Sequence, residues 1–314
     1  MAKLPWKLQY YLKNGYQKTV GTIPGLNIIQ ERMKKASGYY ATRTKDSVLS
    51  QRIKKNVARF NKNGLVPPKV LVEQGTGWSG IDLILFYLGG AEKLYTFDTM
   101  PWLAEPLFKR AIRVALENMD AVYEWEGVDS SEADRRATQL ADVEELTTKE
   151  ILDRMGVIYR VESGFDYAGI EVGTVDLFYT FSVLQRVHLD DLDTLIANSL
   201  SLLRPGGRCC HRVHMKDFHA ITDRRIPPYF YLTISSGLWK LMTSRFVNYQ
   251  NRQRVWFFEE RLQSAGFENV NRDAVEIDTS QIPFVEEHLQ GKFGSREPAE
   301  IATWQTDFHA TCPS

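Results

Sequence analysis

Three glycines with a defined spacing are the clearest sign of chemistry in the chain. Gly75, Gly77 and Gly80 form a G-x-G-x-x-G pattern that begins three residues after the apolar run at 70–72. Glycine permits a tight turn and lets a ligand approach the backbone closely. Asp98 stands 23 residues after Gly75, near the ~20 expected for an acid that hydrogen-bonds ribose hydroxyls. The spacing predicts a nucleoside-containing cofactor; the alternative is an ordinary α/β turn followed by an exposed Asp.

The charge beside the glycines bears on which cofactor binds. In a dinucleotide site, the turn and the helix that follows it face an anionic pyrophosphate. Glu73 adds a carboxylate two residues before the first glycine. S-adenosylmethionine (SAM) carries a sulfonium and an ammonium group, and would tolerate or favour that carboxylate. The turn at 204–207, Arg-Pro-Gly-Gly, and the apolar strand that begins at Val175-Asp176 are two further clues toward SAM.

The elements that must position these residues alternate between strands and helices. Such alternation predicts βαβ units and a parallel, doubly wound α/β sheet. Strands are expected at 70–72, 94–97, 157–161, 175–180 and 208–213, and helices at 81–88, 103–119, 192–203 and 255–265. Three regions follow: an N-terminal helical cap at 1–65, a SAM-binding Rossmann-like core at 66–215, and a C-terminal, substrate-side extension with the final strands at 216–314.

The pieces together resemble the class I SAM-dependent methyltransferases. The matching segments are 73–80, Asp98, 176–187, 204–207 and 265–267, in the family's order and spanning roughly residues 70–270. Segments 89–96, 211–213 and 248–254 look like a bacterial subgroup associated with surface-glycan and exopolysaccharide biosynthesis. The resemblance implies a Rossmann-like core and methyl transfer from SAM.

The resemblance also implies roles for individual residues. The methionine end of SAM would be held by Glu73, Gly75, Thr76 and Gly77. The adenosine would be bound by Asp98 at the ribose, by Thr99 and Met100 beside it, and by Asp166 and Tyr167 at the adenine. Thr180 and Phe181 would line the sulfonium side. The chain departs from relatives at Gln185-Arg186, at His214 and at Phe218, which all concern the acceptor side.

Catalysis on an alcohol acceptor calls for a base near the operating pH, a role that suits histidine. His211, His214 and Asp217 are the candidate catalytic residues, and His219 a candidate substrate-binding residue. His211 ranks first because it lies at the carboxyl end of the fifth strand, where open α/β sheets bind ligands. A structural hydrogen bond is the alternative role for His211, and a turn cap for Asp217.

Two arginines late in the chain are candidates for acceptor binding. Arg252 and Arg254 precede the helix expected at 255–265. They could clamp an acceptor carboxylate or phosphate through bidentate hydrogen bonds. The alternative is that this segment only begins the helix, with Asn251 as its N-cap.

Composition limits the class of protein. Hydrophobic residues make up 43% of 314 and the net charge is zero. The charge is uneven, because residues 1–69 hold fifteen Lys/Arg and two Asp/Glu. No apolar run approaches the ~20 residues of a membrane span. No apolar h-region follows the first residues, so we expect no cleaved secretory signal. The three cysteines fit neither a disulfide framework nor a zinc site, so we expect a cytoplasmic protein without a metal.

These features predict a SAM-dependent methyltransferase with a small-molecule or glycan acceptor, most simply a hydroxyl oxygen. Three alternatives remain open: a nucleic-acid methyltransferase, an NAD-dependent oxidoreductase and a non-catalytic SAM-binding protein. The basic cap motivates the first. Against a nucleic-acid acceptor, residues 180–183 read Thr-Phe-Ser-Val, where such enzymes carry Asn-Pro-Pro-Tyr or Asn-Pro-Pro-Phe.

Overall fold

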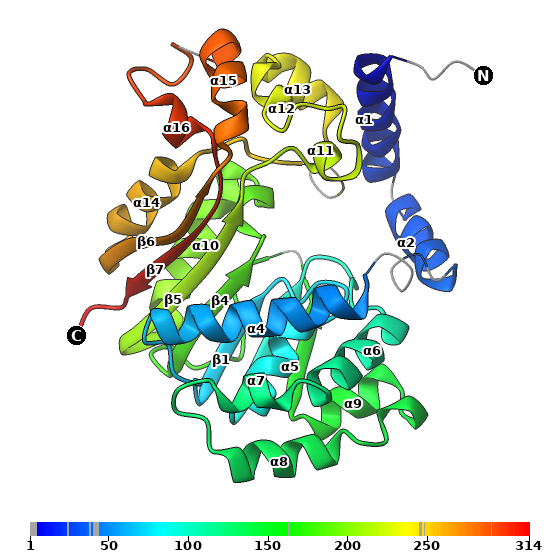
Figure 1. Ribbon diagram of the computed structural model, residues 1–314, viewed down its shortest axis with the longest axis vertical. Coiled ribbons are helices and arrows are strands. Elements are labelled where there is room, and N and C mark those ends of the chain that lie inside the picture. The colour runs from blue at the N-terminus through cyan, green and yellow to red at the C-terminus, as the bar shows by residue number, and fades with distance from the viewer. Residues whose placement is uncertain are drawn as a thin grey trace. The chain divides into compact units, whose positions relative to one another are not determined.

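A seven-stranded sheet organises the chain in the computed structural model, which describes residues 5–23, 25–37, 39, 44–162, 164–244, 247, 249–289 and 291–314. The strand order is β3-β2-β1-β4-β5-β7-β6 (Figure 1). The strands are β1 (Val70–Gln74), β2 (Lys93–Asp98), β3 (Val157–Val161), β4 (Val175–Phe181), β5 (Leu203–His214), β6 (Glu268–Ile277) and β7 (Thr303–Thr311). β1 pairs in parallel with β2 and β4, and β2 with β3, whereas β6 and β7 are antiparallel. The predicted doubly wound, Rossmann-like α/β fold is confirmed.

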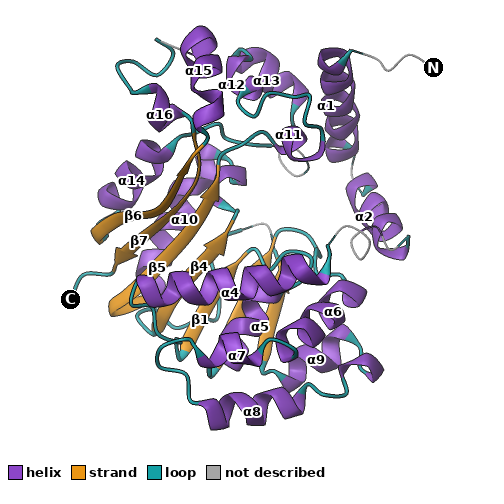
Figure 2. Ribbon diagram, viewed as in Figure 1, coloured by secondary structure: helices purple, strands orange, loops and turns teal. Residues whose placement is uncertain are grey.

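Helices alternate with the strands, as Figure 2 shows. The α-helices are α1 (Trp6–Thr22), α2 (Leu26–Ala36), α4 (Asp46–Lys62), α5 (Ile81–Leu88), α6 (Glu105–Leu116), α7 (Met119–Tyr123), α8 (Ser130–Gln139), α9 (Thr148–Arg154), α10 (Leu189–Leu202), α11 (Phe218–Thr222), α12 (Phe230–Thr233), α13 (Ser236–Met242), α14 (Val255–Ser264), α15 (Ile282–Leu289) and α16 (Pro298–Ile301). Three short 3₁₀ helices are η1 (Val143–Glu145), η2 (Leu184–Arg186) and η3 (Thr279–Gln281).

The chain divides into two compact units. The first unit holds Met1–Gln30, Phe181–Leu200 and Cys209–Pro313, and the second holds Glu31–Thr180 and Ser201–Arg208. The helical segment predicted as a cap at 1–65 is shared between them, because α1 lies in the first unit and α4 in the second. Residues 66–208 of the predicted core lie in the second unit except for Phe181–Leu200. The boundaries predicted at 65 and 215 stay predictions.

Helix α4 covers part of the second unit through an apolar stripe. Leu49, Ile53, Val57 and Phe60 recur at helical spacing and are all buried. The Phe60 ring lies 4.9 Å from the ring of Trp125, which is itself 1% exposed. α4 therefore packs against α5, α6 and α7 through the side chains that the sequence period places on one face.

A buried carboxylate fixes the start of α5 in the same unit. Asp82 is 2% exposed and accepts hydrogen bonds from Arg52 Nε at 3.0 Å and Asn56 Nδ2 at 2.7 Å, both on α4. The hydroxyl of Tyr179 on β4 donates to the same carboxylate at 3.2 Å. A buried charge is tolerated only when it is paired and hydrogen-bonded, and Asp82 meets both conditions. It thereby ties α4, α5 and β4 together.

The first unit has a separate aromatic core. The core cluster gathers Tyr10 from α1 with Tyr229, Phe230 and Tyr231 around α12, and Val285 and Leu289 of α15 belong to it. Tyr10 is fully buried, and its ring lies 5.2 Å from that of Phe230. Helix α1 is thus an integral part of the first unit, although it stands at the opposite end of the sequence.

The parallel strands of the second unit end at the same level. Gln74 at the end of β1 is in register with Phe97 on β2 and with Thr180 on β4. The chain goes from β1 outward to β2 and β3, then returns to the other side of β1 as β4. Open α/β sheets bind ligands at the carboxyl ends of the strands flanking such a reversal. The turn after Gln74 is therefore the expected ligand position.

We predict that Asp82→Ala destabilises the protein by about 2–3 kcal/mol, because Arg52 and Asn56 lose a buried acceptor. Urea unfolding should show a lower midpoint with an unchanged slope. Asp153→Ala, which breaks an exposed ion pair with Lys149, is the control and should change little. Equal stability of Asp82→Ala and wild type would contradict the prediction.

Candidate functional site

The glycine turn has a left-handed backbone and is open at one of its glycines. Gly75, Gly77 and Gly80 have φ values of 93°, 68° and 58°, a region in which other residues are strained. A Cβ on Gly77 would meet no heavy atom within 4 Å. A Cβ on Gly80 would lie 3.0 Å from Phe108 and 3.2 Å from Leu103. Gly80 therefore allows the turn to pack against its neighbours, whereas Gly77 leaves room for a ligand.

Glu73 brings a buried carboxyl group to this turn. Its side chain is 1% exposed and accepts a hydrogen bond from Thr96 Oγ1 at 2.7 Å. The hydroxyl groups of Thr96 and Thr76 are in turn hydrogen-bonded to each other. Burial, aided by the charges of Asp82 and Asp98, raises the pKa of Glu73 to about 8. The carboxyl group is thus protonated at neutral pH.

The end of β2 places Asp98 at the same edge. Asp98 is 3% exposed, and the Tyr159 hydroxyl on β3 lies 3.3 Å from its Oδ2. Burial and the charge of Asp98 raise the pKa of Tyr159, which keeps the phenol as a donor. Thr99 is exposed and Met100 is 6% exposed. Sequence reasoning missed Tyr159, since only the pairing of β2 with β3 brings it to Asp98.

The loop after β3 contributes one exposed and one buried side chain. Asp166 is exposed and accepts the Ala168 N–H at 3.1 Å. Tyr167 is 1% exposed, has a φ of 51°, and donates its hydroxyl hydrogen to Gln74 Oε1 at 3.1 Å. Tyr167 therefore connects this loop to the end of β1, so the predicted adenine-side residues and the glycine turn belong to one edge.

The end of β4 completes the row of strand ends. Thr180 is fully buried and in register with Gln74. Phe181 is half-buried, belongs to the first unit, and lies under the guanidinium of Arg212 at 5.5 Å. Ser182 follows with a φ of 59°, an unusual conformation for a residue with a side chain. Backbone strain of this kind often marks functional sites.

Of the predicted cofactor residues, Glu73, Gly75, Thr76, Gly77, Asp98 and Thr180 thus lie at adjacent strand ends of the second unit. The edge offers hydrogen-bond acceptors, an open glycine and a buried acid. Among the described residues, no cluster of three or more His, Cys, Asp or Glu could hold a metal ion. Within the same ranges, no helix is long and apolar enough to cross a membrane.

The candidate base His211 lies in the interior of the first unit. Its side chain is fully buried, and burial next to His309 lowers its pKa to about 3. His214 is half-buried, with its ring 4.9 Å from Trp304, and burial together with nearby cations lowers its pKa to about 4. Both imidazoles are neutral at pH 7, but such low pKa values make them weak bases.

Asp217 and His219 are held together with Tyr10. The Asp217 carboxylate accepts the Tyr10 hydroxyl and the His219 backbone N–H, both at 2.7 Å. Burial raises the pKa of Asp217 to about 6, and lowers that of His219 to about 4. Asp217 is the N-cap of α11, which is the structural role that the sequence left open.

The two arginines that the sequence suggested as an acceptor clamp form hydrogen bonds within the protein. Arg254 is fully buried and donates to the carbonyl oxygens of Met215, Ile301 and Thr303. Arg252 donates to the Ile234 carbonyl oxygen at 2.6 Å. These hydrogen bonds support the backbone, so the geometry gives neither side chain a clear acceptor-binding role. Asn248 of the same segment lies outside the described residues.

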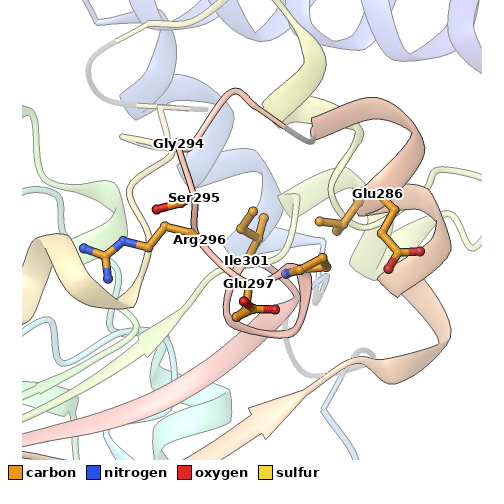
Figure 3. Close-up of a pocket in the computed structure, with 8 residues that line it drawn as sticks. Glu286, Gly294, Ser295, Arg296, Glu297 and Ile301 are labelled. Atoms are coloured by element: carbon orange, nitrogen blue, oxygen red, sulfur yellow. The ribbon is translucent and has the colours of Figure 1, made fainter.

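A hollow in the first unit lies apart from these residues. It is formed by α15 and the segment 294–301, and Figure 3 shows Glu286 and Arg296 directed to opposite sides of it. Arg296 lies over the Trp256 ring at 4.8 Å and approaches Glu260 and Glu300. Its charge is thus already balanced, and none of the predicted site residues lines the hollow.

Comparison with solved structures finds weak similarity to methyltransferases. Phosphoethanolamine N-methyltransferase 2 from Haemonchus contortus, solved with phosphomonomethylethanolamine and S-adenosylhomocysteine, is 15% identical with a TM-score of 0.43, over 83% of this chain and 52% of the other. The S-adenosylmethionine-dependent methyltransferase SibL is 15% identical with a TM-score of 0.42, over 95% and 62%. An O-methyltransferase family protein from Burkholderia thailandensis is 12% identical with a TM-score of 0.42, over 85% and 57%.

The chain therefore spans only about half to three fifths of the length of these three proteins. No protein-family model matches the chain, and no curated protein matches it. The identities are 15% or less and the TM-scores are below 0.5, so these similarities do not establish the function of the chain.

We predict that His211 contributes to acid sensitivity. Its pKa falls from the ordinary 6.5 to about 3 on folding, so the native state favours the neutral ring. This contribution to stability is complete above pH 6.5 and is lost as the pH falls toward 3, by up to about 1.4 kcal/mol per pH unit. The stability difference between wild type and His211→Gln should shrink over that range. His288→Gln, at an exposed histidine, is the control; parallel pH profiles for wild type and His211→Gln would contradict the prediction.

Proposed function

We propose that the protein is a SAM-dependent methyltransferase whose cofactor binds at the carboxyl ends of β1, β2 and β4. The observation that carries the proposal is the buried acid Glu73 beside the open glycine turn. The ammonium and sulfonium of SAM would favour the ionised form of Glu73 and be attracted to it, whereas an anionic pyrophosphate would keep the group protonated and gain no such attraction. An NAD-dependent oxidoreductase is the alternative that the glycine pattern alone would allow.

The proposed roles follow the strand ends. Glu73, Gly75, Thr76 and Gly77 would face the methionine part, and Asp98 would accept hydrogen bonds from the ribose hydroxyls. Thr99, Met100, Asp166 and Tyr167 would surround the adenosine, with Thr180 and Phe181 toward the sulfonium. When bound, SAM supplies an electrophilic methyl group that leaves sulfur as the acceptor attacks in line. Holding the reactants in that geometry supplies much of the rate.

The acceptor is proposed to be a small molecule or glycan with a reactive hydroxyl. Among the candidate bases, Asp217 has the pKa nearest neutrality, at about 6, so we place it ahead of His211 and His214. A non-catalytic SAM-binding protein would bind the cofactor but show no turnover. The association with surface-glycan biosynthesis and the cytoplasmic location stay predictions.

Calorimetric titration with SAM and with NAD tests the cofactor assignment. We expect wild type to bind SAM and not NAD. Asp98→Ala should lose about 1.5–3 kcal/mol of SAM binding, the scale of hydrogen bonds to a charged group. Asp153→Ala, at an exposed position on α9, should bind SAM like wild type. Unchanged SAM affinity in a folded Asp98→Ala variant, or preferential NAD binding, would reject the assignment.

A second prediction concerns the proton on Glu73. Its pKa of about 8 in the free protein means that the group is mostly protonated at pH 7. A bound cation favours the carboxylate, so SAM binding should release a proton from Glu73 at pH 7. Titrations at pH 7 in buffers with different ionisation enthalpies measure that release. Glu73→Gln cannot release this proton and is the control; equal release by both proteins would place the SAM cations away from Glu73.

A further inference from the structure

We propose that the first unit contains a binding site for an oxyanion, a carboxylate or a phosphate group, built on Arg186. The assignment of this anion to the methyl acceptor rests on the proposed function, whereas the anion site itself does not. The site differs from the Arg252 and Arg254 clamp that the sequence suggested.

Arg186 is held in place by a neighbouring segment. It ends the 3₁₀ helix η2, and Asn251 brackets this helix with three hydrogen bonds. The Asn251 side-chain amide donates to the carbonyl oxygens of Leu184 at 2.7 Å and Val187 at 3.2 Å, and its backbone N–H donates to Gln185 at 2.9 Å. Asn251 is 6% exposed, so these hydrogen bonds are shielded from water. The backbone of Arg186 is therefore fixed before any ligand arrives.

The guanidinium of Arg186 is held against an aromatic ring, but its N–H groups donate no hydrogen bond to the described residues. It lies over the ring of Phe218 at 4.5 Å. Among the described residues, none accepts a hydrogen bond from the Arg186 side chain, which distinguishes it from two neighbouring arginines. Arg212 donates to both oxygens of Asp307, and Arg254 donates to backbone carbonyl oxygens. A half-buried, fixed arginine with available donors is suited to receive an acceptor from outside.

Arg186 and three other cations act on two imidazoles. The charges of Arg186, Lys216 and Arg212 act on His214, and those of Arg186 and Lys13 act on His219, although both rings are neutral at pH 7. Asp217 is the acid whose charge acts on Arg186, but its carboxylate already accepts hydrogen bonds from Tyr10 and His219. Burial lowers the pKa of Arg186 to about 10, so the group remains charged at neutral pH without a hydrogen-bonded counter-ion. An anion would supply that counter-ion.

The chemistry of the Arg186 side chain indicates which class of ligand would bind. A guanidinium presents a planar fork of donors that matches the paired oxygens of a carboxylate or phosphate, which a lysine ammonium does not. The guanidinium also lies over the Phe218 ring at 4.5 Å, a cation–π contact that helps to hold it in place. Under the proposed function, the acceptor is accordingly expected to carry an acidic group.

Direct titration of the full chain with inorganic phosphate and, separately, acetate tests the site at low ionic strength. We expect saturable binding of at least one of them, with a Kd of roughly 1 mM, and at least a tenfold loss in Arg186→Gln. Arg261→Gln removes an arginine that also lies over a ring, that of Phe257, but is paired with Asp193; it should bind like wild type. Tighter binding of phosphate or of acetate identifies the acidic group.

Equal anion affinity in wild type and folded Arg186→Gln, or no saturable binding in wild type, overturns the proposal. If Arg186→Gln does not fold, Arg186→Lys retains the charge without the fork, and unchanged affinity in that variant overturns the proposal equally. SAM titration of the same proteins separates the two proposals. Loss of anion binding with normal SAM binding supports this site, while failure of wild type to bind SAM rejects the proposed function and leaves the anion result valid.

Discussion

Two buried carboxyl groups beside one glycine turn are the constraint on which the second unit depends. Asp82 accepts hydrogen bonds from Arg52, Asn56 and Tyr179, whereas Glu73 is hydrogen-bonded to one side chain among the described residues, that of Thr96. Burial and the charge of Asp82 raise the pKa of Glu73 to about 8, so Glu73 is mostly neutral at pH 7. A cationic ligand bound beside Glu73 would favour its carboxylate form, which burial disfavours.

The strand ends around this turn concentrate strain. Tyr167 after β3 and Ser182 after β4 both have positive φ, each at a cost of about 1–3 kcal/mol. Tyr167 offsets part of this cost through its hydrogen bond to Gln74, and Ser182 through its N–H to the carbonyl oxygen of Arg212. Each strained residue is thus supported by the strand next to it. Glu73, Asp98 and Thr180 lie on strands, and the turns and the loop that carry the other predicted cofactor residues of this unit begin at strand ends.

Local patterns in the sequence predicted the fold because they act over a few residues. Apolar runs, the 3.6-residue period of α4 and the glycine spacing determine strands, helices and turns within about twenty positions. Contacts between distant segments have no such signal. Tyr159 reaches Asp98 only because β3 pairs with β2, and Tyr10 reaches Asp217 across most of the chain. The same limit explains why the burial of His211 was not foreseen. Its residue type and its position on the strand favoured the role of a catalytic base, but its full burial follows from packing in the folded chain.

The arginines show most clearly what sequence reasoning lacks. Arg254 and Arg186 are both arginines of the first unit, and the guanidinium of each lies over an aromatic ring. Arg254 donates hydrogen bonds to carbonyl oxygens of residues 39 to 49 positions away in the sequence. These hydrogen bonds connect distant backbone segments of the first unit. Arg186 is fixed by Asn251 through its backbone alone, which leaves its donors for a ligand. Whether an arginine is structural or binding is decided by where the acceptors of its donors lie, and that is a property of the folded chain.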